Sequence, residues 1–110
     1  MKSGEQPFLI LDWQDSRIAL DTSRDRLVFG SRADVDLRVP RPHVSRLHGR
    51  IERRRDTFVL IDESTNGTFV QTEDECVVRV HRGELRLWGE GWFSPGEPLT
   101  DVSAIRFRHD

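Results

Sequence analysis

The chain has 110 residues, which is enough for one domain and too few for two. Its 17 Lys and Arg nearly balance its 19 Asp and Glu, which argues against a general nucleic-acid or membrane binder. A single cysteine excludes an internal disulfide, and no run approaches the ~20 apolar residues of a membrane span. The first apolar stretch is too short for a signal peptide, so we expect a cytoplasmic protein.

Short apolar runs with a period of two predict strands along the whole chain. The expected strands cover residues 8–13, 17–20, 26–30, 35–39, 49–54, 57–62, 68–70, 76–81, 84–88, 91–93 and 104–108. Residues 14–16 and 55–56 are expected to link hairpins, and Pro40 and Pro42 open a loop. A Pro- and Gly-rich segment, residues 94–103, is expected to run over the surface. This pattern predicts an all-β sandwich or barrel.

The stretch FVLIDESTNGTFV, residues 58–70, has two interpretations. Asn66 and Gly67 between strand-like runs are a strong hairpin signal, because both central positions of such a turn have φ > 0. Alternatively, the hydroxyls and the amide form a binding loop on a rigid sheet. The two interpretations are compatible.

Three polar clusters lie beside the expected strands, at residues 29–37, 44–51 and 62–70. In this order and spacing they resemble the forkhead-associated (FHA) domain, a module that binds phosphothreonine peptides. The matching residues are Gly30, Ser45 with His48, Ser64-Thr65-Asn66-Gly67-Thr68, and also Asp36-Leu37. The resemblance predicts one FHA domain over residues 8–108 and an N-terminal tail over residues 1–7. FVLIDESTNGTFV and the closing AIRFRHD look most like FHA domains of bacterial adenylate/guanylate cyclase-type signalling proteins.

The resemblance implies a β-sandwich of about eleven short strands whose loops at one end form the binding site. A phosphothreonine carries about −1.5 to −2 charge, so its site needs donors and positive charge. The hydroxyls of Ser45 and Thr65 and the guanidinium of Arg46 suit that need. In the family, the Asn of the turn bonds the main chain of the peptide, a role that falls to Asn66. Structural support is expected from Gly30 as a turn glycine, a buried His48, Gly67 and Thr68.

One position departs from the family pattern. The family places an Arg directly after the loop glycine, where this chain has Ser31 and then Arg32. Three outcomes are open. Arg32 replaces the family Arg, or Ser31 with Arg46 suffices at weaker affinity, or phosphate binding has been lost. We take the first as the working hypothesis.

Catalysis and metal binding are not expected. Ser45 and His48 lack a nucleophile elbow and a third orienting carboxylate, so we expect no enzyme. The histidines and the single cysteine, which are the candidate metal ligands, do not have the spacing of a zinc site. We therefore expect no metal and no cofactor. These candidates are His43, His48, His81, His109 and Cys76.

Several side chains are given structural roles. Cys76 is expected to be a small buried side chain rather than a reactive thiol. Trp88 and Trp92 are assigned first to the core, and if exposed they would mark a protein interface. Surface ion pairs with arginines are expected for Asp62 and Glu63. Hydrogen bonds to the turn backbone are expected for Ser64 and Thr68.

The expected function is recognition of a phosphorylated protein or peptide in signalling, with a cyclase or other signalling domain as a further partner. The alternative is a degenerate FHA domain that acts as a phospho-independent interaction or dimerisation module through the sandwich face, Trp88 and Trp92, and regulates a nucleotide cyclase. A third, weaker hypothesis is a nucleic-acid-binding barrel that uses Arg50 and residues 53–55. A solvated hairpin explains that basic run better, so neither nucleic acid nor membrane is an expected partner.

Overall fold

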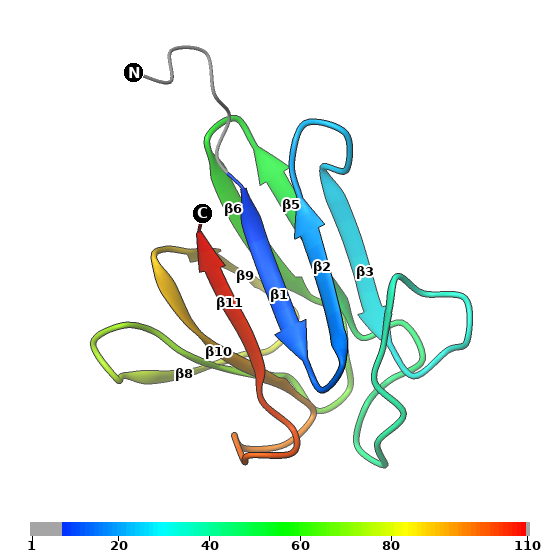
Figure 1. Cartoon of the computed structure of the whole chain (residues 1–110). Helices are drawn as coiled ribbons and strands as arrows, with labels where there is room; N and C mark the ends of the chain where they lie inside the picture. Colours follow the sequence, from blue (N-terminus) through cyan, green and yellow to red (C-terminus); the bar gives the residue numbers. More distant parts are fainter. Residues whose placement is uncertain (1–7, 110) are drawn as a thin grey trace, which may run out of the picture.

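The computed structural model describes residues 8–109, and every regular element in that range is a strand (Figure 1). The strands are β1 (Leu9–Trp13), β2 (Ser16–Leu20), β3 (Arg26–Gly30), β4 (Leu37–Arg38), β5 (Gly49–Arg54), β6 (Thr57–Asp62), β7 (Thr68–Gln71), β8 (Val77–Val80), β9 (Glu84–Leu87), β10 (Glu90–Pro95) and β11 (Ile105–His109). The described range therefore holds no helix that could cross a membrane. The prediction of about eleven short strands is confirmed.

The strands form two sheets that pack face to face. The six-stranded sheet has the order β2-β1-β11-β10-β7-β8, and the five-stranded sheet has the order β4-β3-β5-β6-β9. Pairing is antiparallel except between β3 and β4. The two expected hairpins, β1–β2 and β5–β6, are confirmed, and their turns place Gln14 and Arg55 at φ values of 53° and 59°.

Alternating side chains fill the space between the sheets. The largest fully buried side chains are the phenylalanines Phe29, Phe58, Phe93 and Phe107. Phe29 of the five-stranded sheet meets Phe93 of the six-stranded sheet with ring centroids 5.3 Å apart. Full burial of each such ring contributes roughly 1.5–3 kcal/mol, so these aromatic contacts hold the two sheets together.

The outer face of the five-stranded sheet is covered by charged side chains. Arg50 pairs with Glu52 at 2.6 Å, and Arg54 pairs with both Glu52 and Glu84 at 3.2 and 3.0 Å. Two apolar residues of β6, Val59 and Ile61, also lie on this face, where the apolar stems of such long side chains can cover them. Val59 is only 8% exposed. The basic run on β5 is therefore a network of ion pairs on a solvated hairpin, as expected.

Residues 66 and 67 do not form the tip of a β-hairpin, and that interpretation is wrong. β6 belongs to the five-stranded sheet and β7 to the six-stranded sheet, so the loop between them crosses from one sheet to the other. Of the pair Asn66-Gly67, only Gly67 has a positive φ, 86°, whereas the favoured hairpin turn needs two such residues. The segment predicted as a strand over 35–39 is also shorter, Leu37–Arg38.

The core assignment is wrong for both tryptophans. Trp92 lies between Gly91 and Phe93, which face the core, so its own side chain points outward and is 43% exposed. Trp88 follows the end of β9 and is 55% exposed, with the Arg86 guanidinium carbon 4.0 Å from its ring centroid.

Cys76 is also exposed rather than buried, because it directly precedes β8 at the edge of the six-stranded sheet. The charge of Asp74 and a hydrogen bond to it raise the pKa of the Cys76 thiol. This shift disfavours the thiolate, so exposure does not make Cys76 a reactive cysteine.

The segment between β10 and β11 lies on the surface but is firmly held. The buried Ser103 hydroxyl meets the Ser94 hydroxyl at 2.8 Å and accepts the Thr100 N–H at 3.0 Å. The Trp13 indole N–H donates to the Val102 carbonyl at 3.0 Å. These bonds give this loop a defined shape.

Candidate functional site

The polar clusters that the sequence singles out lie at one end of the sandwich. β3 ends there, β5 begins there, and the loop between β6 and β7 crosses there, whereas β1 begins and β11 ends at the opposite end (Figure 1). Sheet pairing therefore brings residues 29–37, 44–51 and 62–70 together although they are distant in sequence.

The loop before β5 lies alongside the end of β3. Ser31 and Arg32 donate their backbone N–H groups to the carbonyls of Ser45 and Arg46, at 3.0 and 3.2 Å. Gly30 makes this approach possible, because a Cβ there would lie 2.1 Å from the Arg46 carbonyl oxygen. Gly30 belongs to β3 and does not have a positive φ. It is therefore not the expected turn glycine, and it is needed because the backbone of Arg46 approaches it closely.

We expect Gly30→Ala to destabilise the fold by roughly 1–3 kcal/mol, because the added methyl overpacks against backbone that cannot swing aside. Gly83→Ala is the matched control, since a Cβ there meets only the His81 carbonyl oxygen, at 3.9 Å. Urea unfolding of the two variants measures the difference, and equal stabilities would contradict this role of Gly30.

His48 joins the two functional loops from beneath. Its Nδ1 accepts the Ser45 N–H at 3.0 Å, and its Nε2–H lies 2.8 Å from the Gly67 carbonyl that accepts it. The side chain is fully buried. Burial lowers its pKa below 6.5, against the opposing effects of the Gly67 carbonyl and of Asp62. His48 is therefore a neutral buried support, as expected, and both its nitrogens are engaged.

Asp62 organises the crossing loop, and its expected surface ion pair with an arginine is wrong. Its carboxylate accepts hydrogen bonds from the hydroxyls of Ser64 and Thr68 and from the backbone N–H of Arg82, at 2.8, 2.7 and 2.8 Å. The carboxylate is buried, which alone would raise its pKa, but these bonds together lower the pKa below 3.8. Thr68 thus bonds a side chain rather than turn backbone.

Gly67 and Ser64 close the turn that follows Asp62. The Ser64 hydroxyl accepts the Gly67 N–H at 2.7 Å, as expected for a turn serine. The positive φ of Gly67 then allows the chain to reverse into β7.

Acid should destabilise the domain through these buried groups. The folded pKa of His48 lies below its unfolded value of 6.5, so the unfolded state binds the proton more readily. Stability is therefore fully present above that value and should fall as pH drops from about 7 to about 5. Asp62 adds a second loss below 3.8.

Urea unfolding of wild type, His48→Gln and His81→Gln across that pH range measures the slope. The exposed His81 serves as the control, and its variant should keep the wild-type slope. A wild-type slope in His48→Gln would show that His48 is not its source.

Above these supports lies an exposed polar rim, formed by Ser45, Thr65 and Asn66. The Ser45 hydroxyl accepts the Thr65 N–H at 3.2 Å and so joins the two loops. The Asn66 carboxamide donates to the His43 carbonyl at 3.1 Å. Thr65 and Asn66 are exposed and Ser45 is half-buried, so the rim is open to a ligand.

Three arginines surround this rim. Arg46, next to Ser45, is exposed and has no ion pair with a carboxylate among residues 8–109. Arg79 donates to the Asn66 carbonyl at 3.0 Å, and Arg82 donates to the Ser64 carbonyl at 3.1 Å. Sequence reasoning missed Arg79, which reaches the loop because β8 pairs with β7, and Arg82, which follows the end of β8.

The displaced arginine of the first cluster is already engaged. The Arg32 guanidinium forms a two-pronged ion pair with Asp34, in which Nη2 lies 2.9 Å from the second carboxylate oxygen. It lines a hollow together with Leu47 and Arg50, beside the rim rather than within it. Arg38 holds the Ser31 carbonyl at 3.1 Å.

Among residues 8–109, no group of three or more His, Cys, Asp or Glu side chains could hold a metal ion. Ser45 and His48 do not form a nucleophile–base pair, because the imidazole contacts the Ser45 backbone N–H rather than its hydroxyl. What the rim does offer is hydrogen-bond donors next to positively charged arginines, a combination that suits an anion.

Comparison with known proteins agrees with this arrangement. A model of the FHA domain family matches residues 27–86, more than half of the chain. Mycobacterium tuberculosis Rv1747 FHA-1 has a TM-score of 0.75 at 24% identity, covering 94% of this chain and 97% of that chain. The FhaA FHA domain, solved in complex with the intracellular domain of Rv3910, has a TM-score of 0.63 at 27% identity, covering 94% and 100%. No curated sequence matches the chain significantly. The predicted FHA-type β-sandwich is confirmed, and the chain belongs to the FHA domain family.

Proposed function

We propose that this domain binds phosphothreonine peptides at the rim of Ser45, Thr65 and Asn66, and thereby docks phosphorylated partner proteins in signalling. The observation that carries the proposal is the hydrogen bond from the Thr65 N–H to the Ser45 hydroxyl, which joins two donor loops beside Arg46, a side chain with no carboxylate partner in the described range. A solved structure from an analysis of phosphothreonine-dependent FHA domain interactions is 27% identical to this chain and has a TM-score of 0.62. The match covers 93% of this chain and 94% of that chain.

The phosphate would be held by donors of both loops. Because the Ser45 oxygen accepts from Thr65, its own O–H is left to donate outward. The Thr65 hydroxyl and the Arg46 guanidinium supply further donors. Each charge-assisted bond contributes about 1.5–3 kcal/mol, and association itself is costly, so three or four such bonds support roughly micromolar affinity.

Arg79 and Arg82 would assist without touching the phosphate. Each donates to a carbonyl of the crossing loop, which offsets the negative end of that peptide dipole. Asn66 would exchange its bond to the His43 carbonyl for bonds to the main chain of the peptide. The rim would thus read both the phosphate and the backbone that carries it.

The role of the displaced arginine follows from its partner. The ion pair with Asp34 supports the second of the three outcomes, in which Ser31 and Arg46 suffice, and Arg32 is an auxiliary contact. Surface ion pairs contribute little, so Arg32 can leave Asp34 at small cost when a phosphate is present.

We therefore expect Asp34→Asn to tighten phosphopeptide binding severalfold, because it frees Arg32 and removes a carboxylate that interacts with Arg46. Arg32→Ala should weaken binding, and in the Asp34→Asn background its effect should grow. Isothermal titration of the three variants measures this. If Arg32→Ala has no effect in either background, Arg32 makes no auxiliary contact with the phosphate.

Several finer assignments accompany this proposal. The domain over residues 8–108, with residues 1–7 as a tail, would act in the cytoplasm by recruitment rather than catalysis, since FHA domains are interaction modules. A neighbouring nucleotide cyclase or other signalling domain would be the element it regulates, as the sequence resemblance suggests.

Titration with a phosphothreonine peptide library, paired with its dephosphorylated form, tests the proposal. We expect a subset of phosphopeptides to bind at roughly micromolar affinity and the dephosphorylated peptides not to bind. Equal binding of both forms would favour the alternative, a phospho-independent interaction or dimerisation module. The exposure of Trp88 and Trp92 supports that alternative.

A further inference from the structure

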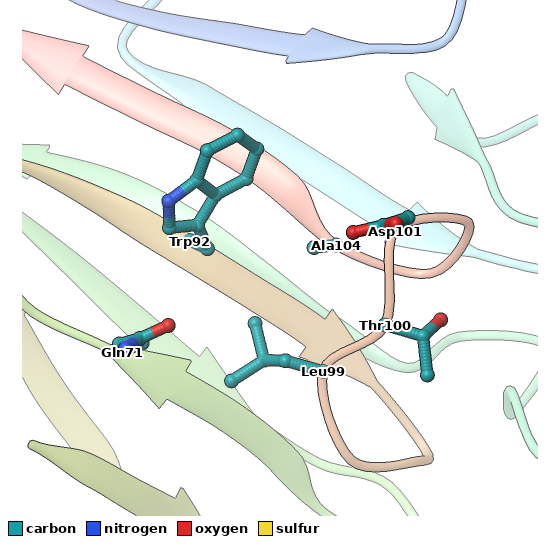
Figure 2. A pocket seen from close by; sticks show the side chains of 6 residues that line it. All are labelled: Gln71, Trp92, Leu99, Thr100, Asp101 and Ala104. Atoms are coloured by element: carbon teal, nitrogen blue, oxygen red, sulfur yellow. The ribbon is translucent and has the colours of Figure 1, made fainter. Parts of the chain in front are cut away.

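The outer face of the six-stranded sheet carries a tryptophan between two hollows. Trp92 of β10 pairs in register with Gln71 of β7 and Arg106 of β11, and its side chain is exposed. One hollow of about 320 Å³ lies towards the loop before β11 (Figure 2). The other, of about 490 Å³, lies towards the loop after β7. Gln71 and Trp92 line both hollows, so we treat the two hollows as one surface, which we call the Trp92 groove.

The wall of the first hollow is preformed. Leu99 and Ala104 give it an apolar lining, and Leu99 projects from the loop towards β7 (Figure 2). This is the loop that Ser103 and Trp13 hold in place. A fixed wall reduces the ordering cost of binding, which favours a specific partner.

The second hollow is acidic. Glu73, Glu75 and Glu90 line it, against a single base, Arg106. Glu90 pairs with Arg106 at 2.9 Å, but Glu73 and Glu75 have no ion pair among residues 8–109. The groove therefore has unpaired negative charge, in contrast to the basic rim of the phosphopeptide site.

The aromatic ring at the centre suits a cation. The Arg106 guanidinium carbon is 6.0 Å from the Trp92 ring centroid, at the outer limit of a cation–π contact. Since the side chain is 43% exposed, part of the ring is still accessible to a second guanidinium or ammonium group.

We propose that the Trp92 groove binds an unphosphorylated, arginine- or lysine-bearing segment of a partner protein. One cationic side chain stacks on Trp92, and the flanking charges meet Glu73 and Glu75. An acidic segment would be repelled by these carboxylates, and a purely apolar one would desolvate them without compensation. The groove shares no residue with the phosphopeptide rim, so one domain can hold a phosphorylated and a basic partner together.

A short capped peptide of alternating arginine and alanine tests this, with a citrulline-for-arginine peptide as its neutral, isosteric control. Titration followed by NMR should shift the Trp92 indole N–H and the amides of residues 71–75 with the arginine peptide. We expect about tenfold tighter binding of the arginine peptide than of the citrulline peptide, since the cation is what the ring and carboxylates select. Equal affinity of the two peptides, or shifts located elsewhere, would overturn the proposal.

Two exposed tryptophans give a matched pair of variants. Trp92→Thr should weaken binding of the arginine peptide by about tenfold, whereas Trp88→Thr should leave it unchanged. Glu73→Gln with Glu75→Gln should weaken it as well, and this variant decides the matter if Trp92→Thr proves unstable. Phosphopeptide affinity should be unchanged in all of them.

Sedimentation of the free domain tests a different occupant of the same face. The proposal predicts a monomer. A wild-type dimer that Trp92→Thr dissociates would show that the groove binds a second copy of this chain, and it would overturn the assignment to a basic partner.

Discussion

Ser45→Ala should weaken phosphothreonine-peptide binding by about 10- to 100-fold while the domain stays folded, because one charge-assisted hydrogen bond is worth about 1.5–3 kcal/mol. The hydroxyl also anchors the Thr65 N–H, so its loss releases one loop from the other. Both effects act on binding, since Ser45 is half-buried and contributes little to the core. Isothermal titration with a phosphopeptide selected from the library measures the change.

Thr57→Val is the control for this variant. It also removes a hydroxyl, but from the β5–β6 hairpin at the opposite end of the sandwich, where, within the described part of the chain, the side chain donates only to the Arg54 carbonyl. Its affinity should match wild type. An unchanged affinity in Ser45→Ala would mean that phosphate contacts lie elsewhere.

Asp62→Ala should destabilise the fold by about 3 kcal/mol or more, because it leaves several buried donors without an acceptor. The hydroxyls of Ser64 and Thr68 and the Arg82 N–H all lose a partner at once. Since this network shapes the crossing loop, phosphopeptide affinity should also fall. Chemical unfolding gives the first quantity and titration the second.

The neighbouring carboxylate provides the comparison. Glu63 is exposed, and among residues 8–109 its carboxylate pairs only with Arg50, at 3.0 Å. Glu63→Ala should therefore change the free energy of unfolding by no more than about 0.5 kcal/mol. If the two variants lost equal stability, Asp62 would not have the organising role described.

The strands were predictable because apolar residues alternate along each of them. In β1, for example, Leu9, Leu11 and Trp13 are buried while the residues between them are half-buried. Alternation also shows why the tryptophan assignment was wrong. Gly91 and Phe93 face the core, so Trp92 must face outward, whereas hydrophobicity alone suggested burial.

The predictions for Asn66-Gly67 and Gly30 were wrong because they depend on contacts between segments that are distant in sequence. The pair Asn66-Gly67 is a hairpin signal only if the flanking strands share a sheet, and sequence spacing cannot show that β6 and β7 do not. The close approach that requires Gly30 depends on the path of Arg46, which is sixteen positions later in the chain. In the same way, Arg79 reaches the crossing loop only through the pairing of β7 with β8.

The most direct test of the central claim, that two loops jointly hold one phosphate, is NMR mapping with a matched pair of peptides. One peptide carries phosphothreonine and the other threonine in the same sequence. We predict the main amide shifts at residues 43–47 and 64–67, with smaller shifts at the adjoining residues 31–32, with the phosphopeptide and none with its partner. Equal shifts with both peptides, or shifts in only one of the two loops, would contradict the claim.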